Sequence, residues 1–87
     1  MGAFYQPELE KSMIDEIKKM ILSASHSGQK IAMFHYQVLI NAEKLSGFDA
    51  VTFCKDVGVP DTYATEFRKM ISLSKLMKEQ GATISAK

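Results

Sequence analysis

A short helical pattern, a glycine and a much longer helical pattern follow one another in the stretch FCKDVGVPDTYATEFRKM, which restricts the fold more than any other feature. Just before it, Asp49 is placed to cap the short helix, because its carboxylate can accept hydrogen bonds from free N–H groups of the first turn. Phe48 and Phe53 occupy the positions of a hydrophobic staple across this cap. Gly58 closes the helix, since glycine takes a left-handed conformation at little cost. The sequence therefore predicts two helices joined by a tight bend that presents the second one outward.

The rest of the chain also carries apolar residues at helical spacing, and no stretch alternates in the manner of a strand. A first helix is expected to begin at Pro7 and to end in the loop SASHSG, because serine and glycine cluster there. A second helix is expected over about 29–45, with Ser27 as its cap. The last helix is expected over 59–80 and is followed by a glycine. These patterns predict a purely helical chain.

The second expected helix is apolar around most of its circumference. Only a narrow strip of it is polar, and that strip consists of Lys30, Gln37, Asn41 and Lys44. A helix of this kind lies at the centre of a core or forms part of a subunit interface. In a chain of 87 residues we expect both, because a small domain gains stability when it pairs with a second copy.

The composition indicates one globular domain of near-neutral charge. The chain is 46% hydrophobic, and we expect a single domain over residues 1–81 with a frayed tail at 82–87. The formal net charge is +1, from 11 basic and 10 acidic residues, which argues against nucleic-acid binding through charge alone. The amino terminus lacks a signal-peptide pattern, and no apolar run approaches the roughly 20 residues of a membrane span. A soluble cytoplasmic protein without a membrane partner is expected.

No constellation of catalytic or metal-binding residues is visible in the sequence. Cys54 is the only cysteine, so an internal disulfide and a cysteine-based zinc site are excluded. His26 and His35 lack companions at ligand spacing, and we expect His35 to lie at the edge of the core with one hydrogen bond. The chain has neither a nucleophile–base pair nor a glycine-rich phosphate loop. We therefore expect a protein that is not an enzyme and that needs no cofactor or metal.

Residues Ala50 to Lys69 resemble the helix-turn-helix motif of DNA-binding regulators. That motif places a small residue where two helices cross, a glycine in the turn and apolar residues on the inner face of both helices. These roles fall on Phe53, Cys54, Val57, Gly58, Val59, Ala64 and Phe67. Cys54 stands where alanine is commoner, and burial in the crossing favours an inert thiol over a reactive one. The resemblance implies an all-α domain of four to five helices that contains a helix-turn-helix at 50–69.

The resemblance also implies that the amino-terminal half of the second motif helix enters the major groove of DNA. Thr62 and Thr65 would contact phosphates or a thymine methyl group, and Lys69 would pair with guanine or phosphate. Tyr63 would contact the nucleic-acid backbone or else lie half-buried against the first motif helix. The residues predicted to contact DNA are Thr62, Tyr63, Thr65, Glu66, Arg68 and Lys69, with Lys55, Lys75 and Lys78 as supporting cations.

Two acidic residues depart from this pattern. Glu66 would accept a hydrogen bond from cytosine, yet Glu66 and Asp61 both place negative charge where phosphates would lie. The resemblance still implies a small protein that binds double-stranded DNA, either a transcriptional regulator or an accessory encoded by a phage or mobile element. A homodimer paired through the second apolar face of the helix at 29–45, or through the first helix, would bind two half-sites about one helical turn apart. The alternative is a non-enzymatic protein–protein interaction module, which the acidic residues and the near-neutral charge favour.

Overall fold

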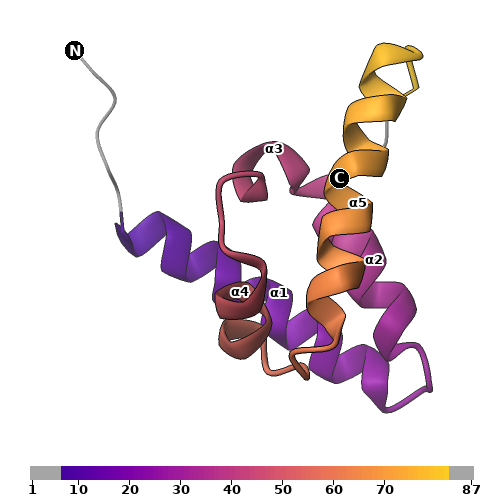
Figure 1. Cartoon of the computed structure of the whole chain (residues 1–87). Helices are drawn as coiled ribbons and strands as arrows, with labels where there is room; N and C mark the ends of the chain where they lie inside the picture. Colours follow the sequence, from indigo (N-terminus) through magenta and orange to yellow (C-terminus); the bar gives the residue numbers. More distant parts are fainter. Residues whose placement is uncertain (1–6, 83–87) are drawn as a thin grey trace.

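Helices joined by turns make up the part of the chain that the computed structural model describes, residues 7–82 (Figure 1). In chain order the helices are α1 (Pro7–Ser25), α2 (Lys30–Ile40), α3 (Ala42–Leu45), α4 (Ala50–Val57) and α5 (Tyr63–Glu79). No strand occurs within these residues, so the predicted all-α fold of four to five helices is confirmed. None of the described helices is both long and apolar enough to cross a bilayer. Most of the expected tail at 82–87 lies outside the described residues.

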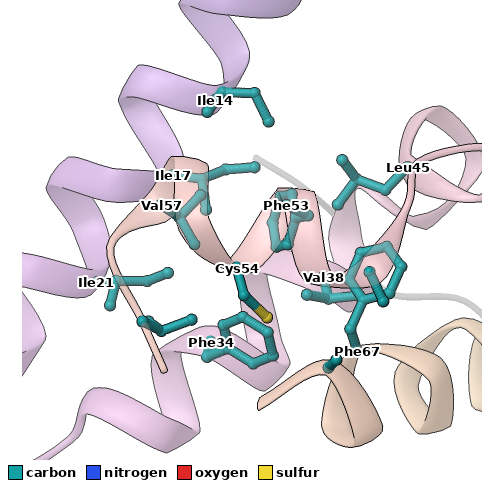
Figure 2. Close-up of a cluster of buried hydrophobic side chains, with 13 residues drawn as sticks. Ile14, Ile17, Ile21, Phe34, Val38, Leu45, Phe53, Cys54, Val57 and Phe67 are labelled. Carbon is teal, nitrogen blue, oxygen red and sulfur yellow. The ribbon is translucent and has the colours of Figure 1, made fainter. Parts of the chain in front are cut away.

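The apolar core lies where α1, α2, α4 and α5 pack against one another (Figure 2). Phe53 of α4 is at its centre, with its ring centroid 5.0 Å from that of Phe67 on α5 and 6.0 Å from that of Phe34 on α2. The buried members of the core are Ile14, Ile17, Ile21, Phe34, Val38, Leu45, Ala50, Phe53, Cys54, Val57, Val59, Ala64 and Phe67. Because α5 packs on both α2 and α4, these two helices together set its direction.

The short helix α4 begins and ends as the sequence predicts. Asp49 precedes it, and its Oδ2 accepts from the backbone N–H of Thr52 at 2.9 Å and from the Thr52 hydroxyl at 3.0 Å. These hydrogen bonds lower the pKa of the Asp49 carboxyl below its ordinary value. The rings of Phe48 and Phe53 meet edge to face at 6.5 Å, which confirms the staple across the cap. Gly58 follows α4 with φ +80°, and the left-handed closure is confirmed.

The apolar stretch expected as one helix over 29–45 is divided into α2 and α3, so that prediction is wrong. The division falls at Asn41, which has φ −109° and ψ 14° and whose Nδ2 donates to the carbonyl oxygen of Gln37 at 2.8 Å. An asparagine side chain bonded to the backbone competes with helical hydrogen bonding, which accounts for the break. The predicted cap is also wrong, because Gln29 precedes α2 while the hydroxyl of Ser27 donates to the carbonyl oxygen of Ala24 at 3.1 Å.

The last helix starts later than the sequence suggests. Residues 60–63 form a turn in which the N–H of Tyr63 donates to the carbonyl oxygen of Pro60 at 3.0 Å, and α5 begins only at Tyr63. Proline disfavours a helical conformation for the residue before it, so Val59 stays outside the helix and is buried beneath the crossing. Thr62 therefore takes the position just before the first helical residue rather than a place inside the helix.

The polar strip predicted for the second helix is wrong at one position. Gln37 is only 6% exposed, although the sequence places it among solvated residues. Its amide is satisfied inside the protein, because Nε2 donates to Sδ of Met33 at 3.4 Å and Asn41 donates to its Oε1 at 3.5 Å. Conversely, the apolar side chains of Ile31 and Tyr36 are exposed, and α2 thus leaves apolar surface uncovered.

Candidate functional site

The bend between α4 and α5 has the geometry that the motif requires. The small Cys54 is completely buried where the two helices approach, and Phe53 on the same helix meets Phe67 of α5 (Figure 2). Val59 is buried in the turn, and Ala64 is buried on the inner face of α5. The positions that carry the resemblance are therefore all buried, apart from the glycine of the turn.

Burial also decides the chemistry of the cysteine. Removal from water raises the pKa of the Cys54 thiol, and the negative charge of Asp61 raises it further, while Arg68 opposes this effect. A buried thiol with a raised pKa carries little thiolate at neutral pH and is a poor nucleophile. The structure thus supports the inert interpretation of Cys54 as a small residue that permits close packing.

Four of the residues predicted to contact DNA share one exposed surface at the start of α5. Thr62 precedes the helix, and Thr65, Arg68 and Lys69 follow on its first turns, all with exposed side chains. The opposite side of the same turns is buried against the core. Lys55 on α4 and Lys75 farther along α5 are exposed as well. Within residues 7–82, no ion pair involves Lys55, Arg68 or Lys75, so their charges face solvent.

Tyr63 is half-buried, as one of the two alternatives expected, but against α2 rather than against the first motif helix. Its ring meets that of Phe34 edge to face, with centroids 5.1 Å apart and planes at 82°. The Nζ of Lys30 lies 5.8 Å from the centroid of the same ring, within the range of a cation–π interaction. The hydroxyl-bearing ring therefore lies between α5 and the first turn of α2.

The carboxylate of Glu66 is engaged within the protein. Its Oε1 is 2.8 Å from Nε2 of His35 on α2, and its Oε2 is 3.5 Å from Nζ of Lys69. The hydrogen bond with His35 is the main cause that lowers the pKa of the Glu66 carboxyl, partial desolvation opposes it, and the charge of Lys69 adds to it. Both oxygens thus have partners, so Glu66 is positioned to join α2 to α5 rather than to face an incoming base.

The single hydrogen bond expected for His35 is present, and its partner is Glu66. The pair spans 31 positions of sequence, and only the packing of α2 on α5 brings the two residues together. The pairing also affects one of the two acidic residues that depart from the motif. Of the two acidic residues near the predicted DNA surface, Glu66 has a hydrogen bond with His35 and an ion pair with Lys69, whereas Asp61 is exposed in the turn.

Lys78 lies apart from the other predicted cations. Its Nζ is 2.7 Å from Oε2 of Glu43 on α3, and this contact lowers the pKa of the Glu43 carboxyl. The pair closes the side of α5 that faces α3, beyond the turns that carry Thr65 and Lys69. Lys78 therefore neutralises an acidic neighbour, and the structure does not bring it together with the exposed surface at the start of α5.

Among the residues that the structure describes, no group of three or more His, Cys, Asp or Glu side chains is arranged to hold a metal ion. A family model described as an HTH-like domain matches residues 9–80 of the chain. No curated protein and no solved structure matches the chain.

Proposed function

The chain belongs to the family of HTH-like domains, and from that membership we propose that it is a small DNA-binding protein that acts on double-stranded DNA. The amino-terminal half of α5 enters the major groove, where Thr62, Thr65 and Lys69 meet base edges or backbone. The biological role that fits is that of a transcriptional regulator or of an accessory encoded by a phage or mobile element. No step of this mechanism is covalent.

The observation that carries the proposal is the exposed surface at the start of α5. A helix can fill the major groove only if the side that enters it is free while its other side is held by the protein. The first turns of α5 meet this condition, because Thr65 and Lys69 are exposed while Ala64 and Phe67 on the other side are buried.

The charges near this surface are compatible with a phosphate lattice. Arg68, Lys55 and Lys75 are exposed cations without ion pairs within residues 7–82, and each is available for a backbone phosphate. The carboxylate of Glu66 is hydrogen-bonded to His35 and paired with Lys69, which reduces the repulsion that a free carboxylate would cause. Glu66 and Asp61 offset Arg68 and Lys69 at the start of α5, so the net attraction for phosphate depends on Lys55 and Lys75 as well.

Binding to a pool of short random-sequence duplexes is expected to weaken steeply as salt rises, because phosphate contacts release counterions. In a mobility-shift titration, Lys69→Ala is expected to lower the affinity about fivefold to tenfold near 0.1 M salt and to reduce the salt slope by about 0.9. Thr65→Ala is expected to lower it about twofold to tenfold by removing one hydrogen bond. Lys11→Ala is the control, because Lys11 pairs with Asp15 on α1, a helix that does not contact α5.

Two results of this titration would contradict the proposal. If the unaltered protein shifts no duplex at low salt, it does not bind DNA in the manner proposed. If it binds and neither Thr65→Ala nor Lys69→Ala weakens the complex, DNA is bound through another surface.

A protein–protein interaction module is the second candidate, and exposed leucines on α5 favour it. Leu73 is 38% exposed and Leu76 is 51% exposed, and both lie in the carboxy-terminal half of α5. Large exposed apolar side chains grouped on one element are typical of surfaces that bind another protein. An apolar contact of this kind would change little between low and moderate salt, in contrast to DNA binding.

Pairing of two copies is part of the proposal, since two half-sites about one helical turn apart call for a symmetric dimer. The surface that fits is a groove between α1 and α2, where Met20 is 37% exposed and Tyr36 is 42% exposed. Sedimentation of the free protein is expected to show a dimer, and Tyr36→Lys is expected to convert it to a monomer by placing charge in the groove. Leu22→Lys is the matched control, because Leu22 is 61% exposed but does not line the groove. A monomeric unaltered protein would contradict the pairing.

A further inference from the structure

The first turn of α2 lies beside the first residue of α5. The ammonium group of Lys30 is 5.8 Å from the ring centroid of Tyr63, and Phe34, one turn farther along α2, meets the same ring edge to face at 5.1 Å. The hydrogen-bonded pair His35–Glu66 ties the same two helices together at 2.8 Å. These three contacts hold Lys30 in a defined place next to the start of the helix that we propose enters DNA.

No carboxylate within residues 7–82 neutralises the charge of Lys30. Within residues 7–82, Lys30 takes part in no ion pair, and its ammonium group lies over the face of the Tyr63 ring. Its side chain is half-buried, whereas those of Lys69 and Lys75 are exposed. A lysine whose ammonium group lies over an aromatic ring loses less side-chain freedom on binding than one that is fully solvated.

The position of this cation corresponds to a wall of the major groove. A helix with its side chains is about 10–12 Å across and the groove is about 12 Å wide, so phosphates lie just beyond both flanks of an inserted helix. Lys30 is displaced from α5 by one aromatic ring, on the flank that faces α2. Arg68 is five positions after Tyr63, about 140° farther around the helix, and so belongs to the other flank. Arg68 also influences the pKa values of Asp49 and Cys54, which places it on the side of α4.

We propose that α2 is part of the DNA interface and that Lys30 binds a backbone phosphate on the groove wall opposite to the one contacted by Arg68. This inference rests on the proposed function, because it assumes that the start of α5 occupies the groove. It assigns to Lys30 a role that lies outside the helix-turn-helix, and it makes Tyr63 the support that positions the cation. The contact is to phosphate, so it strengthens binding to all sequences alike.

The test is a mobility-shift titration of the full chain against short random-sequence duplexes over a range of salt concentrations. Lys30→Gln keeps the length of the stem and removes the charge, and it is expected to reduce the salt slope by about 0.9 and the affinity about fivefold to tenfold near 0.1 M salt. Lys30→Arg keeps the charge and is expected to restore most of both. Lys11→Gln carries the same change of charge on α1 and is expected to stay within about twofold of the unaltered protein. Thermal unfolding of each variant verifies that the fold is intact.

The outcomes separate this inference from the proposed function. If the unaltered protein binds duplexes with a steep salt slope and Lys30→Gln binds with the same slope, Lys30 contacts no phosphate and the inference is wrong, although the proposed function stands. If Lys30→Gln and Lys11→Gln weaken binding equally, the effect is one of net charge and the inference is again wrong. If the unaltered protein does not bind duplexes at all, both the proposed function and the inference about Lys30 are wrong.

Discussion

Replacement of Phe53 by alanine is expected to lower the free energy of unfolding by about 3–5 kcal/mol. Phe53 is completely buried, and its ring meets those of Phe34, Phe48 and Phe67 at centroid distances of 6.0, 6.5 and 5.0 Å. Truncation removes apolar area from the core and also leaves a cavity bounded by three rings that belong to different parts of the chain. Because the neighbouring rings come from α2, from the residue before the cap of α4 and from α5, no single helix can move to fill the space.

Urea-induced unfolding followed by circular dichroism measures this loss. A domain of this size has a stability of only about 4–13 kcal/mol, so Phe53→Ala is expected to lose a large part of it. Phe53→Leu, which leaves a smaller cavity, is expected to lose about 1–2 kcal/mol and remains measurable if the alanine variant fails to fold. Phe48→Ala is the matched control, because Phe48 is only partly buried and its loss costs less. Equal losses for Phe48→Ala and Phe53→Ala would show that Phe53 is not the centre of the core.

The local features of the bend could be predicted from sequence because their causes are local. Asp49 caps α4 through a residue three positions away, the staple joins Phe48 to Phe53, and Gly58 needs only its own backbone freedom. Each of these depends on residues that are neighbours in the chain, so the local sequence is sufficient to predict them. The buried face of α5, with Ala64 and Phe67, follows from the same kind of local spacing.

Two helix boundaries were predicted wrongly, for different reasons. The periodicity of 29–45 is unbroken, yet Asn41 interrupts the helix because its side chain bonds to a backbone carbonyl, a choice that spacing does not reveal. The helix α5 starts at Tyr63 rather than at Val59. Pro60 disfavours a helical conformation for Val59, and turn hydrogen bonds from Tyr63 to Pro60 and from Ala64 to Asp61 come before the helix. In both cases the sequence correctly predicts helical structure but misplaces the end of a helix.

The side-chain pairs that join α5 to α2 and α3 could not be predicted, because they depend on how these helices pack. His35 and Glu66 are 31 positions apart, and Glu43 and Lys78 are 35 positions apart. Nothing in the spacing of either pair indicates contact. The exposed surface at the start of α5 followed from the resemblance. The partners of Glu66 and the position of Lys30 over the ring of Tyr63 depend on tertiary packing, which the spacing of residues does not reveal.

Replacement of Gly58 by valine is expected to lower the free energy of unfolding by about 2–3 kcal/mol, because a β-branched residue must be forced into the left-handed conformation. Gly58 has φ +80°, and a Cβ at this position would meet Cε of Lys18 at 3.7 Å, an ordinary contact distance. Space is therefore available, and the cost comes from the backbone alone. It follows that Gly58→Asn, a residue that tolerates this conformation, is expected to lose only about 1 kcal/mol or less.

A second glycine provides the matched control for this prediction. Gly47 does not have a positive φ, and a Cβ there would meet nothing within 4 Å, so Gly47→Val is expected to change stability by no more than about 0.5 kcal/mol. Thermal or urea-induced unfolding of the three variants under identical conditions gives the comparison. The expected order of stability loss is Gly58→Val, then Gly58→Asn, then Gly47→Val. If Gly58→Val and Gly47→Val lose the same amount, the positive φ of Gly58 costs a branched residue nothing, and the expected backbone strain is absent.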